Sequence, residues 1–223
     1  MNELIFFSHV CLLIAAILIA LRLGKEALIS CLGLQLVIAN LFVTKQIVCF
    51  GFHVTCSDVY TVGALFSLNL IQEFYGKIAA KKAIWTAFFL LFFFIIMARL
   101  HLSYIPSPHD TMHGVFSTLL AASPRIMIAS FAVGIISQRL DVFIYGILKK
   151  RLPEKAFIFR FGGASLISQL VDTVLFSFLA LYGLIHSMTD IIIMSYLIKV
   201  SIIFCMAPFT QFAKRFYRDP IQV

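Results

Sequence analysis

Inside an otherwise apolar stretch of the chain, four polar residues recur at helical spacing: Ser165, Ser168, Gln169 and Asp172. Residues three and four positions apart lie on one face of a helix, so two hydroxyls, an amide and a carboxylate would share that face. A carboxylate at bilayer depth costs about 2.5 to 3.5 kcal/mol on insertion scales, and an ionisable residue there indicates a functional site. The chemistry open to this face is hydrogen bonding, and the pattern predicts a polar cavity beside it.

A second copy of this pattern stands 31 residues earlier, in segment 136–142. Gln138 and Asp141 there match Gln169 and Asp172, and each glutamine follows a serine. Adjacent membrane helices run in opposite directions, and at about 1.5 Å per residue from the cytoplasmic boundary Asp141 lies about 11 Å deep and Asp172 about 16 Å deep. We therefore expect the two carboxylates to share one cavity. The alternative is a chance similarity between two amphipathic helices.

Lys199 interrupts a later apolar segment about 14 Å from its outer end, close to the depth of Asp172. An ion pair between the two would lower the cost of burying both charges. Such a pair either belongs to a ligand site or serves folding alone, since intramembrane charges usually pair. Arg125 opens another apolar segment at the outer boundary, where an arginine either anchors the helix or contacts a ligand.

The segment 58–77 holds the densest set of polar and aromatic residues, with Asn69 and Glu73 near its inner end. A planar heterocycle needs this chemistry, because amides offer a donor beside an acceptor and a carboxylate accepts two parallel N–H bonds. Phe66 and Tyr75 are candidates for stacking on such a ring. The alternative is an ordinary helix end with a polar cap.

Membrane helices must position these residues, because 61% of the chain is hydrophobic, only 13% is charged and the mean hydropathy is +1.01. Soluble domains carry about 25% charged residues. Seven segments are long enough to cross about 30 Å of hydrocarbon: 4–21, 27–44, 52–72, 83–100, 125–148, 161–185 and 190–212. Their apolar runs are continuous, which favours helices over barrel strands. We predict an all-α, polytopic integral membrane helix bundle.

Basic residues set the orientation of these helices. In a seven-helix topology, 13 of the 18 Lys and Arg residues fall on one side, in clusters around Arg22, Lys81, Lys150 and Lys214. We expect that side to be the cytoplasm, with the amino terminus outside and the carboxyl terminus inside. The net charge of +8 follows from this topology, so the lipid bilayer and not a nucleic acid is the expected partner.

Motifs of several enzyme classes do not occur in the sequence, namely the nucleophile elbow, the phosphate-binding glycine loop and the zinc-protease motif. Glu73, Tyr75 and His186 do not assemble a reactive constellation by spacing. His109 and His113 are four residues apart, but the prolines around them favour a loop over a metal-binding helix. We therefore expect neither an enzyme nor a metal or organic cofactor.

Five motifs are spread over the chain: Asn40-Leu-Phe-Val-Thr-Lys45; Asp58 with Asn69-Leu-Ile-Gln-Glu73-Phe-Tyr-Gly76-Lys77; Arg125-Ile-Met-Ile-Ala-Ser130; Gln138 with Asp141; and Ser168-Gln169 with Asp172-Thr173. Together they resemble the queuosine precursor transporter family, also called the vitamin uptake transporter family. Members are usually described with six helices. The resemblance therefore implies a six-helix core at 27–213, with an extra helix and basic loop at 1–26 before it and a basic cytoplasmic tail at 214–223 after it.

The resemblance implies a carrier in the bacterial inner membrane for 7-deazaguanine bases, namely 7-cyano-7-deazaguanine, its aminomethyl derivative or queuine, which serve tRNA modification. Asp172 would accept the base's N–H donors. The other candidate binding residues are Gln169, Asn69, Gln138, Asp141, Glu73, Lys199, Asn40, Phe66, Tyr75 and Arg125. The alternative is the substrate-binding subunit of an energy-coupling vitamin transporter, since no ATP-hydrolysing motif is found. A second copy or an energising subunit would be the protein partner.

Overall fold

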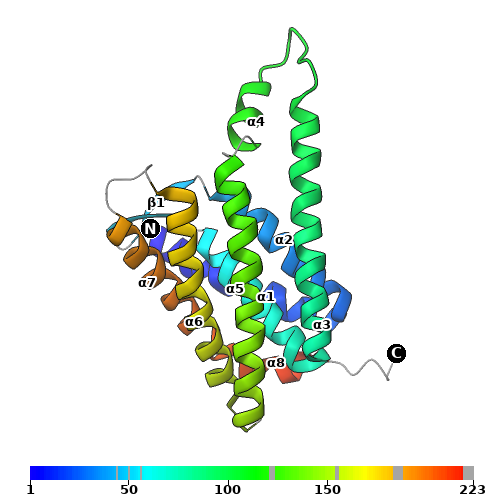
Figure 1. Cartoon of the computed structure of the whole chain (residues 1–223), viewed down its shortest axis with the longest axis vertical. Helices are drawn as coiled ribbons and strands as arrows, with labels where there is room; N and C mark the ends of the chain where they lie inside the picture. Colours follow the sequence, from blue (N-terminus) through cyan, green and yellow to red (C-terminus); the bar gives the residue numbers. More distant parts are fainter. Residues whose placement is uncertain are drawn as a thin grey trace.

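The computed structural model describes residues 1–43, 45–49, 51–55, 57–120, 124–153, 156–182 and 188–217, and within them all side chains except those of residues 46, 52–55, 124–127, 181 and 190. The described chain is a helix bundle with one small β-hairpin (Figure 1). Its elements are α1 (Asn2–Leu23), α2 (Lys25–Phe42), β1 (Gln46–Cys49), β2 (Phe52–Thr55), α3 (Ser57–Leu102), α4 (His113–Leu120), α5 (Pro124–Arg151), α6 (Phe157–Phe176), the π-helical turn η2 (Ser177–Leu181), α7 (Met188–Met206) and α8 (Phe209–Phe216).

Helix α3 consists of two helices that meet at Gly76, where the backbone leaves the helical region with φ 87° and ψ 168°. Glycine suits this position because a positive φ is costly for a residue with a Cβ. The chain reverses direction there, so the two arms of α3 form a hairpin (Figure 1). These arms correspond to the third and fourth predicted segments.

Five helices are long and apolar enough to cross a membrane, and the bent pair of α7 and α8 makes a sixth candidate. Because α3 contains two helices, each of the seven predicted segments corresponds to a helix of the described chain. The prediction of an all-α membrane bundle is thereby confirmed. One boundary was wrong: the third segment was expected from residue 52, but residues 52–55 pair with β1 as strand β2 and the helix begins at Ser57.

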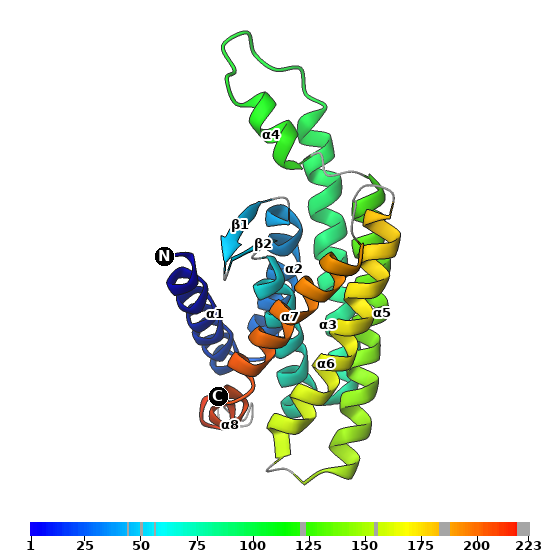
Figure 2. The same ribbon diagram turned by 90° about the vertical axis from the view of Figure 1, so that its left-hand side faces the viewer.

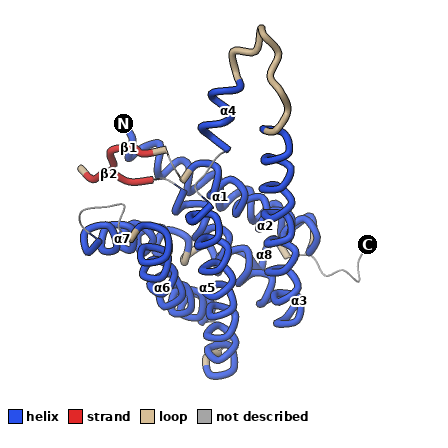
Figure 3. Tube along the Cα trace, turned by 45° about the horizontal axis from the view of Figure 1, so that its top comes forward, coloured by secondary structure: helices blue, strands red, loops and turns tan. Residues whose placement is uncertain are grey.

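The β-hairpin lies beside the start of α1, as the red strands of Figure 3 show. Its two strands pair antiparallel, with Gln46 opposite Thr55 and Cys49 opposite Phe52. The side-chain amide of Asn2 donates to the carbonyl of Val48 over 2.8 Å, which ties the hairpin to the first helix.

The last predicted segment, 190–212, is broken, because α7 ends at Met206 and α8 begins at Phe209 with a bend of 48° between them. Pro208 stands directly before α8, where its missing N–H costs nothing. Lys214 and Arg215 lie in the last turn of α8. The basic region predicted at 214–223 therefore begins inside a helix, and residues 218–223 lie outside the described part.

Helix α1 is packed into the bundle: Ile17 and Leu21 are buried against the same core as Leu28 of α2 and Phe66 of α3. Close packing drives helix association in a bilayer, and small residues permit it. Gly33 of α2 shows this, since a Cβ there would lie 2.5 Å from a methyl carbon of Leu90 on the second arm of α3.

The connections that carry the basic clusters lie toward one end of the bundle. In Figure 2 the α1–α2 junction, the turn at Gly76, the α5–α6 connection and α8 are all in the lower part, whereas the β-hairpin and α4 lie higher. This arrangement agrees with the sidedness expected from the distribution of Lys and Arg.

Candidate functional site

Polar and charged side chains are concentrated where α3, α5, α6 and α7 meet. They form three groups, which we name by a central residue. The Lys199 cluster comprises Asp58, Ser137, Asp172, Thr173 and Lys199; the Asp141 cluster comprises Asn69, Asp141, Ser165 and Ser168; the Glu73 cluster comprises Gln72, Glu73, Tyr145, Lys149 and Arg160.

The Lys199 cluster joins α3, α6 and α7 around one buried ammonium group. Lys199 Nζ lies 2.8 Å from Asp172 Oδ2 and donates to Thr173 Oγ1 over 3.1 Å. Asp58 Oδ1 lies 3.8 Å away on the other side. The ion pair predicted between Asp172 and Lys199 is therefore confirmed. Asp58 adds a second carboxylate to the same cation, so this cluster holds two acidic groups and one basic group.

The Asp141 cluster surrounds a fully buried carboxylate with neutral groups. Asn69 Nδ2 donates to Asp141 Oδ2 over 2.8 Å. The hydroxyls of Ser168 and Ser165 donate to Oδ1 over 3.1 and 3.5 Å. These contacts connect α3, α5 and α6 in the interior of the bundle.

The two copies of the serine–glutamine–aspartate pattern bind each other. Ser137 of α5 donates to Asp172 of α6 over 3.0 Å, and Ser168 of α6 donates to Asp141 of α5 over 3.1 Å. The serine of each copy thus contacts the aspartate of the other, as antiparallel helices related by a local two-fold axis would allow. These two bonds bring the carboxylates onto facing sides of α5 and α6, and the expectation that they share one cavity stays a prediction.

Gln138 and Gln169 lie beside these two reciprocal bonds, one on each helix. Their exposed fractions are 4% and 1%. In the described part of the chain, neither carbonyl oxygen has a hydrogen-bond partner. The amide oxygens of Gln35, Asn69 and Gln72 are also without a partner there. Buried amide oxygens are nearly always satisfied in folded proteins, so the pair on the facing helices α5 and α6 indicates a place for a ligand with N–H donors.

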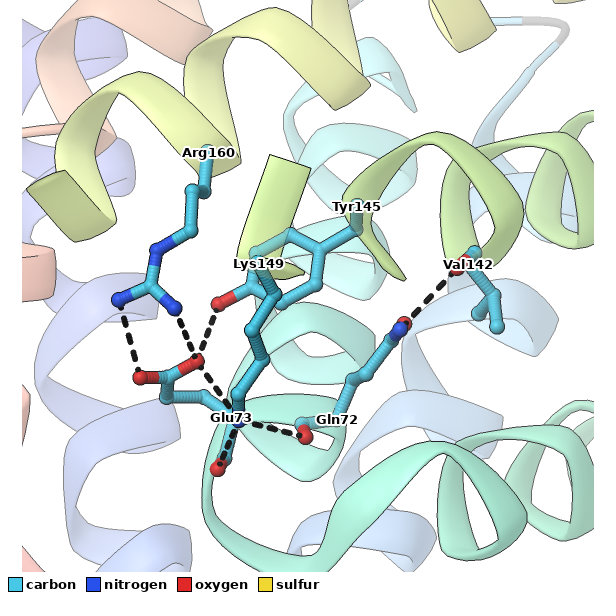
Figure 4. Close-up of polar contacts among 6 residues, drawn as sticks. All are labelled: Gln72, Glu73, Val142, Tyr145, Lys149 and Arg160. Carbon is cyan, nitrogen blue, oxygen red and sulfur yellow. Dashed lines mark hydrogen bonds and ion pairs between the residues drawn. The ribbon is translucent and has the colours of Figure 1, made fainter. Parts of the chain in front are cut away.

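The Glu73 cluster is a network of charges, shown in Figure 4. Arg160 binds both carboxylate oxygens of Glu73 over 3.1 Å each, and Tyr145 donates to Oε2 over 2.7 Å. Lys149 Nζ lies 3.0 Å from the same Oε2 and donates to the backbone carbonyl of Glu73 over 2.7 Å. Gln72 donates to the carbonyl of Val142 over 3.0 Å.

The contacts of Glu73 fasten α3 to α5 and α6 close to the turn at Gly76. A bidentate arginine–carboxylate pair is among the stronger polar contacts available to a protein. Both oxygens of Glu73 are engaged in this way, so the residue connects the three helices. The ligand role expected for it from the sequence stays a prediction.

Three other candidate residues, Asn40, Phe66 and Tyr75, belong to none of these clusters. Asn40 donates to the carbonyl of Leu36 within α2, over 2.9 Å. Phe66 is fully buried, and its ring meets that of Phe161 edge to face. Tyr75 lies next to Gly76, with its ring 5.6 Å from that of Tyr217. The side chain of Arg125 and all of His186 fall outside the described residues. Ligand roles for these three residues and for Arg125 stay predictions.

Sequence reasoning missed Arg160 and Tyr145 as members of a buried network. Arg160 is counted among the 13 basic residues expected on the cytoplasmic side, in the cluster around Lys150, yet its exposed fraction is only 1%. The signal that could have found it is the apolar sequence around it, Phe157-Ile-Phe-Arg160-Phe161, which is unusual for a solvated loop. Tyr145 lies one turn beyond Asp141 on the polar face of α5, where helical spacing predicts it, but spacing does not give its partner, Glu73.

The arrangement is suited to recognition by hydrogen bonds. It offers carboxylates, amides and hydroxyls, together with the ammonium groups of Lys149 and Lys199 and the guanidinium of Arg160, held on four helices. Within the described ranges no group of three or more His, Cys, Asp or Glu side chains is placed to hold a metal ion. A compact polar molecule is the kind of ligand that such a lining fits.

Comparisons with known proteins agree with this assignment. Residues 55–213, which include α3 to α7 and the first part of α8, match the family described as "Putative vitamin uptake transporter". The chain is also similar to the "Probable queuosine precursor transporter" of Bacillus subtilis (strain 168), with 30% identity over 195 residues, which are 86% of this chain and 85% of that protein. No solved structure matches the chain. With its membrane helices, and with matches of this extent, this multi-pass membrane protein belongs to the vitamin uptake transporter family.

Proposed function

We propose that this protein imports queuosine precursors, which are 7-deazaguanine bases, across the bacterial inner membrane for use in tRNA modification. The observation that carries the proposal is the similarity, over most of both chains, to the Bacillus subtilis protein named as a probable queuosine precursor transporter. The substrates in this class are 7-cyano-7-deazaguanine, 7-aminomethyl-7-deazaguanine and queuine. All three share one guanine-like edge, which a lining of amides and carboxylates would recognise.

The guanine-like edge presents two donors, N1–H and the 2-amino group, beside the O6 acceptor. Gln138 and Gln169 each offer a buried acceptor oxygen without a partner in the described chain. Asp172 has one hydrogen-bond partner on each oxygen, so each oxygen retains a lone pair. In our proposal these three side chains receive the two donors, and Asp172 makes the stronger, charge-assisted bond.

The O6 acceptor needs a donor, and Lys199 is our candidate. Two of its three N–H groups are used by Asp172 and Thr173, at hydrogen-bond distances. The carboxylate of Asp58 lies 3.8 Å away, which is an ion pair but too long for a hydrogen bond. The third N–H can therefore turn toward a substrate without losing a strong bond.

In a carrier with alternating access, the Glu73 cluster would act as the closure at one end of the site. Its bonds join α3, α5 and α6 near the basic connections of the bundle. Following the positive-inside rule, we propose that this end faces the cytoplasm. The carboxyl terminus, which follows α8, would then be cytoplasmic.

The test in cells uses a strain that cannot make 7-deazaguanine bases and lacks its own importer. Expression of this protein should restore queuosine in tRNA when a low concentration of one base is supplied, and should fail to do so without the base. An unrelated inner-membrane carrier expressed at the same level is the control. Absence of queuosine with all three bases, despite folded protein in the membrane, would refute the proposal.

The test in liposomes separates a self-sufficient carrier from a substrate-binding subunit. Purified protein should exchange labelled 7-cyano-7-deazaguanine against the unlabelled base across the membrane. Binding of the base without exchange would instead support the role of a subunit that depends on an energising complex.

A further inference from the structure

We infer that Asp141 carries a proton through the transport cycle, so that uptake of the base is coupled to an inward flow of protons. This inference rests on the proposed function and adds its energy source. Its starting point is the contrast between the two copies of the serine–glutamine–aspartate pattern. Asp172 has the ammonium group of Lys199 at 2.8 Å, whereas Asp141 is fully buried and takes part in none of the ion pairs of the described residues.

Asp141 is held by three neutral donors, Asn69, Ser165 and Ser168. Hydrogen bonds of this kind stabilise a carboxylate less than a nearby cation does in a medium of low dielectric constant. A carboxyl group buried without a countercharge is more easily kept neutral by taking up a proton. The site is therefore built to hold Asp141 in either form.

Ser168 supplies the means for this change. Its hydroxyl oxygen lies 3.1 Å from Asp141 Oδ1 and 3.2 Å from the backbone carbonyl of Ser165. One hydroxyl hydrogen cannot serve both acceptors well. When Asp141 is ionised, Ser168 donates to it; when Asp141 is protonated, its O–H donates to Ser168, which donates to the carbonyl instead. The change needs one proton and a rotation of one hydroxyl, with no heavy atom displaced.

On the helices beside Asp141, the acidic and phenolic groups of the described chain are engaged elsewhere. On α3, Glu73 lies one turn beyond Asn69 and binds Arg160 and Lys149. On α5, Tyr145 lies one turn beyond Asp141 and donates to Glu73.

Four further charged groups on these helices have partners other than Asp141. Asp172 of α6 and Asp58 of α3 share Lys199. The guanidinium of Arg139, on α5, lies 4.9 Å above the ring of Trp85. Lys77 of α3 lies 5.9 Å from the ring of Phe143. Asp141 is thus the described carboxylate best placed to bind and release a proton without breaking an ion pair.

The proton-binding residue Asp141 and the proposed substrate ligands Gln138 and Gln169 would be coupled because they are close neighbours along α5 and α6. Gln169 follows Ser168 directly, and Gln138 lies one turn before Asp141 on α5. Reversal of the Ser168 hydroxyl therefore occurs beside both open amides. In each cycle Asp141 takes one proton from the outer solution as a base enters, and releases it to the inner solution as the base leaves.

The decisive experiment uses the purified full chain in liposomes, with the membrane potential clamped at zero by valinomycin and equal potassium concentrations. An inward proton gradient of one pH unit should accumulate labelled 7-cyano-7-deazaguanine by about tenfold, the limit for one proton per substrate. A pH-sensitive dye trapped inside should report acidification when unlabelled base is added outside. These readouts need only the wild-type protein, so they decide the inference even if variants fold poorly.

Asp141→Asn tests the residue itself, because asparagine copies the shape and the donor of the protonated acid but cannot release a proton. Because Asp141 is itself a candidate binding residue, this variant should exchange labelled for unlabelled base more slowly than the wild type, but still measurably. It should lose accumulation driven by a proton gradient and the dye response. Glu26→Gln is the matched control, since Glu26 is an exposed acid in the first turn of α2 and its loss should change nothing.

The outcomes separate this inference from the proposed function. Exchange of the base with accumulation that does not depend on the proton gradient would overturn proton coupling and leave the function standing. Accumulation driven by an inward sodium gradient at equal pH would overturn it also, in favour of a metal cation. Gradient-driven accumulation by Asp141→Asn would remove Asp141 from the role. No exchange of any of the three bases by folded wild-type protein would refute the function and, with it, the coupling.

Discussion

Ser137 of α5 donates a hydrogen bond to Asp172 of α6 over 3.0 Å, and the same bond recurs in the opposite direction from Ser168 to Asp141 over 3.1 Å. The two helices are thus joined by a pair of equivalent contacts, although among the described side chains only Asp172 of the two aspartates forms an ion pair. The hydrogen bonds of Asp141 and Asp172 are thus alike, but their charged neighbours differ, which suggests different roles for the two carboxylates. This difference also makes each contact separately testable.

The first prediction concerns Asp172. Asp172→Asn should lower uptake of the base by about tenfold or more, because loss of a charge-assisted hydrogen bond costs about 1.5 to 3 kcal/mol. The level of folded protein should remain near that of the wild type, since Asp58 still lies 3.8 Å from the Lys199 ammonium group. Uptake assays and detergent-extracted protein levels measure the two effects. If Asp172→Asn combined with Lys199→Met transports normally, Asp172 serves folding and not binding.

The second prediction concerns the reciprocal serine bonds. Ser137→Ala should weaken substrate binding, because Asp172 loses the donor that orients it, and the effect should disappear in an Asp172→Asn background. A double-mutant cycle on the apparent Michaelis constant for uptake would show a coupling of about 0.5 to 3 kcal/mol. Additive effects of the two substitutions would show that the 3.0 Å contact has no part in binding.

The third prediction uses the two open amides. Gln138→Leu and Gln169→Leu should each reduce uptake while leaving thermal stability unchanged or slightly raised, because each removes a buried acceptor that has no partner in the described chain. Gln35→Leu is the contrasting variant: the carbonyl oxygen of Gln35 is also without a partner in the described chain, but its amide donates to Ser67 over 3.0 Å, and the substitution removes that bond. It should lower the unfolding temperature and leave the substrate concentration dependence intact. Wild-type uptake by both leucine variants at 138 and 169 would contradict the proposed site.

The fourth prediction concerns the Glu73 cluster. Glu73→Gln should destabilise the protein strongly, because Arg160 would be left buried without its carboxylate, a loss of about 3 to 5 kcal/mol for buried pairs. Lys149→Met should cost less than about 1 kcal/mol, since the Lys149 side chain is 37% exposed and the pair is partly screened. Thermal unfolding in detergent compares them. Equal losses would show that the closure does not depend on the Arg160 pair.

The fifth prediction concerns orientation. A reporter fused after Val223, which lies outside the described residues, should be found in the cytoplasm, and one inserted at Pro108, in the loop between α3 and α4, should be found outside. Protease protection in spheroplasts checks both. Both reporters on the same side would refute the seven-helix topology.

Hydropathy was sufficient to find the helices, because each crossing requires a long apolar run and the sequence has little else. It was not sufficient to place their ends where local chemistry decides. Residues 52–55 are apolar enough to continue a helix, yet they pair with β1. The sequence predicts that one helix ends and another begins near Gly76. It does not predict the positive φ of Gly76, which is a property of the folded backbone.

A contact in the site could be predicted from the sequence where two residues lie at the same depth in the bilayer, because depth follows from the position of a residue in its helix. Asp172 and Lys199 lie at similar depths and form the expected pair. Asp58 was not assigned to the same cation, because that contact depends on how α3 packs against α7. The environment of Asp141 was equally hidden, since both copies of the pattern contain the same residues and only tertiary structure gives a cation to one of them.

The pairing of Asp58 and Asp172 with a single lysine has a consequence for selectivity among the precursors. Two carboxylates against one ammonium group leave an excess of one negative charge in the bundle interior when all three groups are ionised. A cationic substituent on the ring would neutralise this excess, whereas an uncharged nitrile would not. We therefore expect 7-aminomethyl-7-deazaguanine, with its protonated amine, to compete better than the cyano compound for entry, and Asp58→Asn to reduce that preference.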